Sequence, residues 1–288
     1  MKKILFVSAL ILQILLPGCS GDSEKGSLRV MTINIRYDNP RDNANTWTNR
    51  IPIVCSFLDN EKPDLIGMQE VLYQQYHVLD SALKDYGSVA AGRTDGLKAG
   101  EMNPVFYRKD RFELIRTRTF WLSETPEVPG SMSWGAGLPR IVTWVELADK
   151  NNDCHFFYFN THFAHDSDSA RKKSARLLLV KADSIASGFP IIVTGDLNMP
   201  PTSEGYSVLT GPFESVPLLR DSYDISEKTP EGPVYTFNGF TDKPGEGRID
   251  YVFVRDGMRV LEHKTIIRKE KGIFISDHWP VIATVSFK

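Results

Sequence analysis

Several features that often explain a sequence are scarce in this chain. Only three of its 288 residues are cysteine, so a dense disulfide framework does not hold it together. The 34 basic and 36 acidic residues nearly cancel, and no run of five lysines or arginines occurs. We therefore expect no tight binding of duplex DNA, which usually needs a strongly basic face. What remains is the composition of an ordinary globular domain.

Long apolar runs are scarce too, and the longest lies near the N-terminus. Lys2 and Lys3 precede an apolar stretch from Ile4 to Leu16. This stretch is shorter than the roughly 20 residues of a membrane-spanning helix. Its position after basic residues is typical of a secretory signal, and an uncleaved anchor is the alternative.

The residues that follow, Leu16-Pro17-Gly18-Cys19, resemble the lipobox of bacterial lipoproteins. The resemblance implies that residues 1–18 are a signal peptide, that Cys19 is lipidated, and that residues 19–27 are a tether. We therefore expect an exported lipoprotein that is anchored to a membrane, either the outer membrane or a periplasmic or cell surface.

The rest of the chain, residues 28–288, is expected to form one domain and a monomer. Runs of predicted strands are interrupted by a few helices, which predicts an α+β fold with two packed, mostly antiparallel sheets and helices outside. The sequence does not show whether Cys55 and Cys154 pair. The predicted strands are 28–35, 65–68, 103–108, 112–122, 141–147, 155–162, 190–194, 248–254, 259–267 and 279–287, and the predicted helices are 49–58, 73–83 and 167–186.

The first candidate site residues are in Gly195-Asp196-Leu197-Asn198, which ends the apolar run 190–194. Because side chains alternate along an extended chain, Asp196 and Asn198 are expected to point to the same side. A carboxylate and a carboxamide together suit a metal-bound phosphate that is attacked by water. By themselves, the same residues are also common in surface turns.

Other polar residues also lie where apolar strands begin or end. Each has a structural alternative: Asn34 could mark a bulge, Glu70 could cap a helix, His162 could be a buried core histidine, and Asp250 could pair with an arginine. Their number at strand ends favours a common site. The full set is Asn34, Glu70, His162, Asp196, Asn198, Asp250, Asp277 and His278.

In this order these residues resemble the endonuclease/exonuclease/phosphatase superfamily, which includes DNase I-like nucleases. The resemblance extends over residues 28–287. It implies a four-layer α/β/β/α sandwich and a phosphoester hydrolase that depends on Mg²⁺ or Mn²⁺.

The resemblance also implies roles for single residues. It makes Glu70 the main metal ligand, with Asn34 and Asp277 beside it. Asp196 activates or holds the attacking water, and Asn198 orients the water or the phosphate. Asp250 pairs with His278, and both His278 and His162 contact the phosphate. Whether Asp196 or His278 is the base, and whether one or two metal ions bind, stays open.

The substrate is less well defined. Tyr107, Arg108 and Arg140 are further candidates for substrate contact, and the loop 123–140 with Trp134 is expected either to form a rim over the site or to be a plain surface excursion. We expect a phosphodiesterase acting on a nucleic acid, lipid or sugar diester. The alternatives are a phosphomonoesterase acting on sugar or inositol phosphates, and a surface binding module without activity.

Overall fold

The computed structural model describes residues 26–212, 216–255 and 257–288. The predicted signal peptide, Cys19 and most of the predicted tether lie outside these ranges. The helices are α1 (Trp47–Glu61), α2 (Tyr73–Ala82), α3 (Asp168–Ala186), α4 (Glu204–Thr210) and α5 (Ser222–Ile225), with a 3₁₀ turn η1 (Asn43–Asn45). The strands are β1 (Leu28–Asn34), β2 (Leu65–Gln69), β3 (Tyr86–Val89), β4 (Val105–Arg108), β5 (Phe112–Trp121), β6 (Ile141–Asp149), β7 (Cys154–His162), β8 (Ile191–Asp196), β9 (Leu219–Asp221), β10 (Asp250–Arg255), β11 (Met258–Thr265), β12 (Lys269–Glu270), β13 (Ile273–Phe274) and β14 (Val281–Phe287).

Two six-stranded sheets form the centre of the described structure. Their strand orders are β11-β14-β1-β2-β4-β3 and β5-β6-β7-β8-β10-β9. The pairs β1–β2 and β7–β8 are parallel, and the other neighbouring strands in these two sheets are antiparallel. The predicted fold, two mixed and mostly antiparallel sheets flanked by helices, is therefore confirmed.

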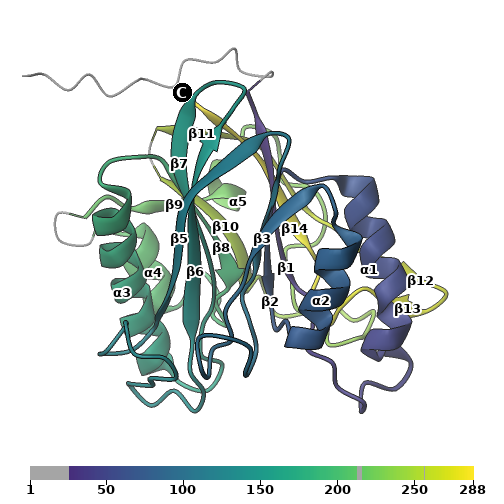
Figure 1. Cartoon of the computed structure of the whole chain (residues 1–288). Helices are drawn as coiled ribbons and strands as arrows, with labels where there is room; N and C mark the ends of the chain where they lie inside the picture. The colour runs from purple at the N-terminus through teal and green to yellow at the C-terminus, as the bar shows by residue number, and fades with distance from the viewer. Residues whose placement is uncertain (1–25, 213–215, 256) are drawn as a thin grey trace, which may run out of the picture.

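Three apolar layers hold the four structural layers together. One layer lies between the sheets, where Val30 of β1 and Ile192 of β8 belong to the same buried cluster. A second joins α1 and α2 to the first sheet, and a third joins α3 and α4 to the second sheet. Figure 1 shows α1 and α2 on one outer side of the sandwich, and α3 and α4 on the other.

Strand alternation decides which residues face the other sheet. On β1, Leu28 and Val30 lie between the sheets, whereas Met31 and Ile33 pack beneath the helices. Because the side-chain period of a strand is two residues, Asn34 faces the interior between the sheets. The same alternation on β8 turns Ile192, and therefore Asp196, toward the first sheet.

The structure adds features that the sequence did not predict. The edge strand β3 is half-buried throughout and contains Gly87, so its sequence has no clear alternation. Within the described part of the chain, Cys55 is a free cysteine, so it does not pair with Cys154. None of the helices described is both long and apolar enough to cross a membrane.

Candidate active site

The polar residues at the strand ends meet between the two sheets, at one end of the sandwich. Asn34 is the last residue of β1, and Asp196 is the last residue of β8. Asn34 Nδ2 donates to Asp196 Oδ2 over 2.9 Å, and both side chains are fully buried. Two residues 162 positions apart thus form the centre of a polar cluster.

Glu70 lies beside this pair on strained backbone. Its φ of 60° is in the left-handed region, and Arg36 has a similar φ of 58°. Glu70 Oε1 accepts from Asn34 Nδ2 at 3.1 Å, and Oε2 accepts from the backbone N–H of Tyr37 at 3.1 Å. Left-handed backbone costs a non-glycine residue about 1–3 kcal/mol and is concentrated at functional sites. The carboxylate is therefore held in a position that the local backbone alone would not favour.

Arg36 is a site residue that the sequence interpretation missed. Its guanidinium lies between two carboxylates, with NH1 4.0 Å from Glu70 Oε2 and Nε 3.6 Å from Asp277 Oδ2. Asp42 fixes it through a 3.0 Å bond to Nε. Burial raises the pKa of the Asp277 carboxyl. The sequence does contain one indication of this role, because Arg36 is a charged residue two positions after Asn34, just beyond the end of an apolar strand.

Asp250 and His278 form a second buried pair. Asp250 lies directly opposite Asp196 on the neighbouring strand. His278 Nδ1 donates to Asp250 Oδ2 at 2.8 Å, and His278 Nε2 lies 3.8 Å from Asp196 Oδ2. Burial alone lowers the pKa of His278, but the two carboxylates outweigh it and raise the pKa well above its usual value. His278 therefore favours its charged form, in which both ring nitrogens are donors.

The environment of Asp196 has the opposite effect on its charge. Burial, and secondly the repulsion from Asp250, raise the pKa of the Asp196 carboxyl to about 7. His278, the Asn34 amide and the backbone N–H of Asn198 oppose this shift. A carboxylate with a pKa near neutrality can accept a proton from a water molecule more readily than an ordinary aspartate.

His162 and Asn198 complete the other side of the cluster. Asn198 Nδ2 lies 2.9 Å from His162 Nε2 and also donates to the backbone carbonyl of Phe163 at 3.1 Å. With the amide nitrogen as donor, His162 Nε2 is the acceptor, and the ring proton is on Nδ1. Burial, and secondly the charge of Arg140, lower the pKa of His162 well below its usual value. His162 is therefore neutral, unlike His278.

A buried polar layer beneath the cluster joins the two sheets. Gln69 Nε2 donates to Asn160 Oδ1 at 2.7 Å, and Thr194 Oγ1 donates to the same oxygen at 3.2 Å. Tyr158 Oη shares a 2.8 Å bond with Thr194 Oγ1. Gly67 leaves room for this layer, because a side chain there would collide with three of its atoms.

Arg50 on α1 was also missed, although it holds two site segments in place. Its guanidinium donates to the backbone carbonyls of Ile35, Arg36 and Ile275. These carbonyls precede or follow Asn34, Asp277 and His278 closely in the chain. Arg50 is fully buried on the apolar face of its helix, together with Ile53, Val54 and Phe57. The sequence indicates this burial, because Arg50 is a single arginine at the helical spacing of the apolar residues on that face.

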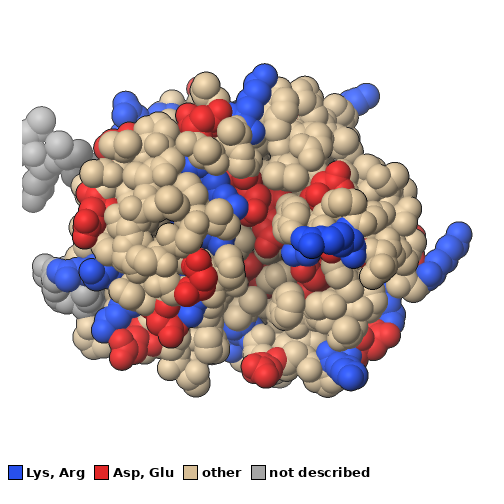
Figure 2. Space-filling model, turned by 90° about the horizontal axis from the view of Figure 1, so that it is seen from below, with Lys and Arg blue, Asp and Glu red and all other residues tan. Residues whose placement is uncertain are grey.

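The cluster forms the wall of a cavity of about 550 Å³. Figure 2 views the molecule from below relative to Figure 1. It shows a depression in the centre of that face, with acidic side chains in the depression and basic side chains at its edge. Phe237 is 46% exposed and forms part of the wall, with its ring 5.1 Å from the His278 ring. The lining residues are Arg36, Tyr37, Glu70, Glu101, Leu138, Arg140, His162, His165, Asp196, Asn198, Phe237, Ile249, Asp277 and His278.

The long loop 123–140 contributes to this cavity through its last residues only. Leu138 and Arg140 line the cavity, which agrees with the predicted position of Arg140. Trp134 is not among the lining residues, and its indole donates to Glu124 Oε1 at 3.1 Å. The end of the loop therefore forms part of the rim of the cavity, whereas Trp134 lies outside the lining.

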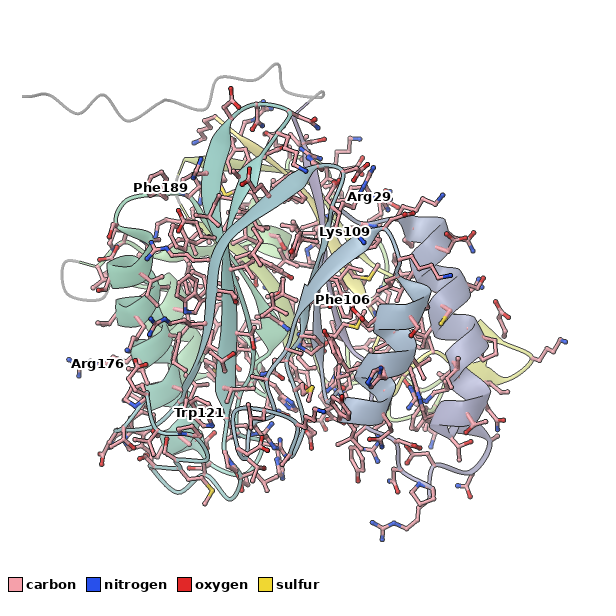
Figure 3. The ribbon with its side chains drawn as sticks, in the orientation of Figure 1. Arg29, Phe106, Lys109, Trp121, Arg176 and Phe189 are labelled. Carbon is pink, nitrogen blue, oxygen red and sulfur yellow. The ribbon has the colours of Figure 1, made fainter. Side chains whose placement is uncertain are left out.

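Tyr107 and Arg108 do not reach the cluster, contrary to the sequence interpretation. Strand β4 runs antiparallel to β2, and Tyr107 pairs with Leu65, at the start of β2. Glu70 follows the other end of β2, so Tyr107 and Arg108 lie at the wrong end of the sheet. Figure 3 shows Lys109 near Arg29 at one end of the sandwich and Trp121 at the other. Tyr107 packs between the sheets, and Arg108 contacts Asp110 and Asp64.

The cluster has the donor set of a site for a hard divalent cation. Among the described residues, Asp196, Asp250 and His278 have ligand atoms within 4.8 Å of one another. Asp250 Oδ1 is buried and has no hydrogen-bond partner in the described structure. With Glu70 and Asp277 the site contains four carboxylates, and oxygen ligands of this kind suit Mg²⁺ and Mn²⁺.

Comparison with known proteins identifies relatives over nearly the whole chain. An endonuclease/exonuclease/phosphatase family protein of known structure from Bacteroides vulgatus is 37% identical, with a TM-score of 0.86, over 91% of this chain and 99% of that one. A mannosyl-6-phosphatase from Bacteroides thetaiotaomicron is 33% identical, with a TM-score of 0.82, over 90% of this chain and all of that one. An uncharacterized mimivirus protein is 27% identical over 252 residues, which are 82% of this chain and 91% of that protein.

The model of the endonuclease/exonuclease/phosphatase family matches residues 31–278. This range begins within β1 and ends at His278, so it includes Asn34, Glu70, His162, Asp196, Asn198, Asp250 and Asp277 as well. Members of this family are hydrolases that act on phosphoester bonds and generally use a divalent metal ion. The chain belongs to the endonuclease/exonuclease/phosphatase family.

Proposed function

We propose that this chain is an exported, metal-dependent phosphatase that hydrolyses a sugar phosphate monoester. The observation that carries the reaction is a buried pair, Asp196 and His278, in the wall of a cavity, with Asn34 and Asp250 hydrogen-bonded behind them. The mannosyl-6-phosphatase that is 33% identical over most of the chain supports a sugar monoester. This proposal puts the monoester ahead of the diester that the sequence interpretation favoured.

We further propose that Glu70 holds the metal ion, with Asn34 and Asp277 beside it. Glu70 and Asp277 line the cavity, whereas Asp250 is hydrogen-bonded to His278 and is not among the lining residues. Mg²⁺ or Mn²⁺ bound there would offset the negative charge of the phosphate and act as a Lewis acid.

The protein's own groups would then perform the proton transfers and orient the substrate. Asp196 would orient the attacking water and accept its proton, because its pKa lies near neutrality. His278, charged through Asp250, would donate a hydrogen bond to an oxygen on which negative charge develops. Asn198 and the neutral His162 would hold the phosphate on the opposite side.

An assay of the purified protein with two chromogenic esters tests this function. We expect hydrolysis of p-nitrophenyl phosphate and of hexose 6-phosphates with Mg²⁺ or Mn²⁺, and loss of activity with EDTA. Faster hydrolysis of bis(p-nitrophenyl) phosphate would instead support a phosphodiesterase. Absence of hydrolysis of either ester with Mg²⁺, Mn²⁺ and Ca²⁺ would support a binding module without activity.

We also propose that the protein is a monomeric lipoprotein that does not bind duplex DNA tightly. The most basic segment of the sequence lies on α3, where Arg171 pairs with Asp168 and Lys172 pairs with Glu204. Figure 3 shows Arg176 pointing outward from the same helix. Metabolic labelling with a fatty acid, with a Cys19→Ser variant as the control, tests the anchor.

A further inference from the structure

A cationic wall faces the acidic part of the active-site cavity. Arg140 lines this cavity, although its side chain is only 5% exposed. Its Nε and NH1 atoms are buried and have no hydrogen-bond partner within the described ranges. A buried guanidinium normally has its donors satisfied, so these two donors at a cavity are available to a bound anion.

Among the described residues, Glu101, Asp196 and Glu70 attract the charge of Arg140, but no hydrogen bond joins any of them to it. Glu101 is instead paired with both terminal nitrogens of Arg93, at 2.8 Å each. Two guanidinium groups therefore share one carboxylate on this wall. A buried charge that lacks its own ion-pair partner is unfavourable, and a bound anion would offset that cost.

His165 adds a second donor to the wall. Arg140 NH2 lies 3.0 Å from His165 Nδ1. Since a guanidinium cannot accept a hydrogen bond, Nδ1 is the acceptor and the His165 proton is on Nε2. Arg140 and His165 thus both present N–H donors, and their outer surface is suited to an anion.

This wall lies next to the phosphate-side residues of the cluster. Arg140 is the charged group with the largest influence on the His162 ring, and Arg93 is the next. His162 is 2.9 Å from Asn198 and 3.5 Å from Asp196. A phosphate held by these three residues would therefore have Arg140 beside it, in the same cavity that Glu70 and Asp277 line.

We propose that Arg140, positioned by His165, binds an unesterified oxygen of the substrate phosphate and so makes the site selective for monoesters over diesters. This inference rests on the proposed phosphatase function. A monoester dianion has three unesterified oxygens and two negative charges, whereas a diester has two such oxygens and one charge. A diester would place an ester oxygen with its substituent against the wall, and the guanidinium would stay unpaired.

The experiment compares kcat/KM for p-nitrophenyl phosphate and bis(p-nitrophenyl) phosphate in the wild type and in Arg140→Gln. Hydrogen bonds to charged groups contribute about 1.5–3 kcal/mol, so we expect monoester turnover to fall roughly 10–150-fold. Diester turnover should change by less than about fivefold. The matched control is Arg118→Gln, at an exposed position on β5, which should change neither value.

A second variant and a binding measurement keep the test decisive. His165→Ala leaves the guanidinium in place without its positioning contact, and we expect a smaller loss that is again confined to the monoester. Equal losses for both esters, or no loss for either, would overturn the inference. If the wild type hydrolyses neither ester, the proposed function fails. Calorimetric titration of inorganic phosphate then decides the inference, which requires weaker binding in Arg140→Gln than in the wild type and in Arg118→Gln.

Discussion

Replacing Asp196 by asparagine should reduce activity and also remove the pH dependence of stability that Asp196 contributes. Asparagine has the same shape but cannot ionise, so it removes the proton acceptor that we assign to the attacking water. General acid–base groups contribute about 10²–10⁴-fold to rate. We expect kcat to fall within that range while the variant stays folded.

The effect on stability follows from the raised pKa of Asp196. The folded protein holds this proton up to about pH 7, whereas an unfolded aspartate loses it near 3.8. The contribution of Asp196 to stability is therefore full below about pH 4 and is lost as the pH rises through about 7. At about 1.4 kcal/mol per pH unit, this loss is about 3 kcal/mol between pH 5 and pH 8. The raised pKa of His278 acts in the same direction at higher pH.

The Asp196→Asn variant lacks this loss but has a cost of its own. Asp196 accepts hydrogen bonds from Asn34 Nδ2 and from the backbone N–H of Asn198, both at 2.9 Å. An asparagine has one acceptor oxygen, so one buried donor is left unpaired at a cost of about 1–3 kcal/mol. We therefore expect the variant to be less stable than the wild type at pH 5 and at least as stable at pH 8.

The assay is urea unfolding of both proteins in EDTA at pH 5, 6, 7 and 8. The exposed Asp59→Asn variant on α1 is the control for loss of one acidic charge. The difference in unfolding free energy between wild type and Asp196→Asn should fall steadily as the pH rises. A constant difference across these values would refute the assigned pKa, and near-normal kcat would refute the catalytic role.

Changes at four other residues test separate parts of the site. His278→Ala should lower kcat about 10²–10⁴-fold without a change in the circular dichroism spectrum, and full activity would contradict its role. Glu70→Gln should abolish the rise in melting temperature that Mg²⁺ or Mn²⁺ produces in the wild type, because the main oxygen ligand is weakened. Gly67→Ala should destabilise the protein by about 1–3 kcal/mol in urea unfolding, because the new Cβ would lie within 2.6 Å of buried oxygens. Arg50→Met should cost about 2–4 kcal/mol of unfolding free energy, because it leaves buried carbonyls unpaired, and Arg50→Lys should recover only part of that loss.

Much of the fold could be predicted because the strands are strongly patterned. Apolar residues alternate or run continuously in most predicted strands. Helix α3 begins within one residue of its predicted start, where the Ser167 hydroxyl accepts from Ala170 N–H at 3.1 Å. The strand β3 was missed because its four half-buried residues carry no such pattern. Local sequence decides secondary structure where one face is buried, and decides little at a short edge strand.

The supporting residues of the site were harder to predict than its central ones. Asn34, Asp196 and Asp250 stand out as polar residues at the ends of apolar strands. Arg36 and Arg50 have ordinary local sequences, and their roles depend on carboxylates and carbonyls that are distant in the chain. Arg50, for example, contacts the carbonyl of Ile275, which is 225 positions away.

By itself the sequence determined which face of each strand the site residues occupy, because the two-residue period of a strand follows directly from local spacing. The positions of Asn34, Asp196 and Asp250 where apolar strands begin or end also favoured a common site. Only the tertiary structure decided which strands are neighbours and in which direction each one runs, because these depend on long-range pairing. That is why Asp196 meets Asn34 across the sandwich, whereas Tyr107 and Arg108, on the antiparallel β4, lie at the opposite end.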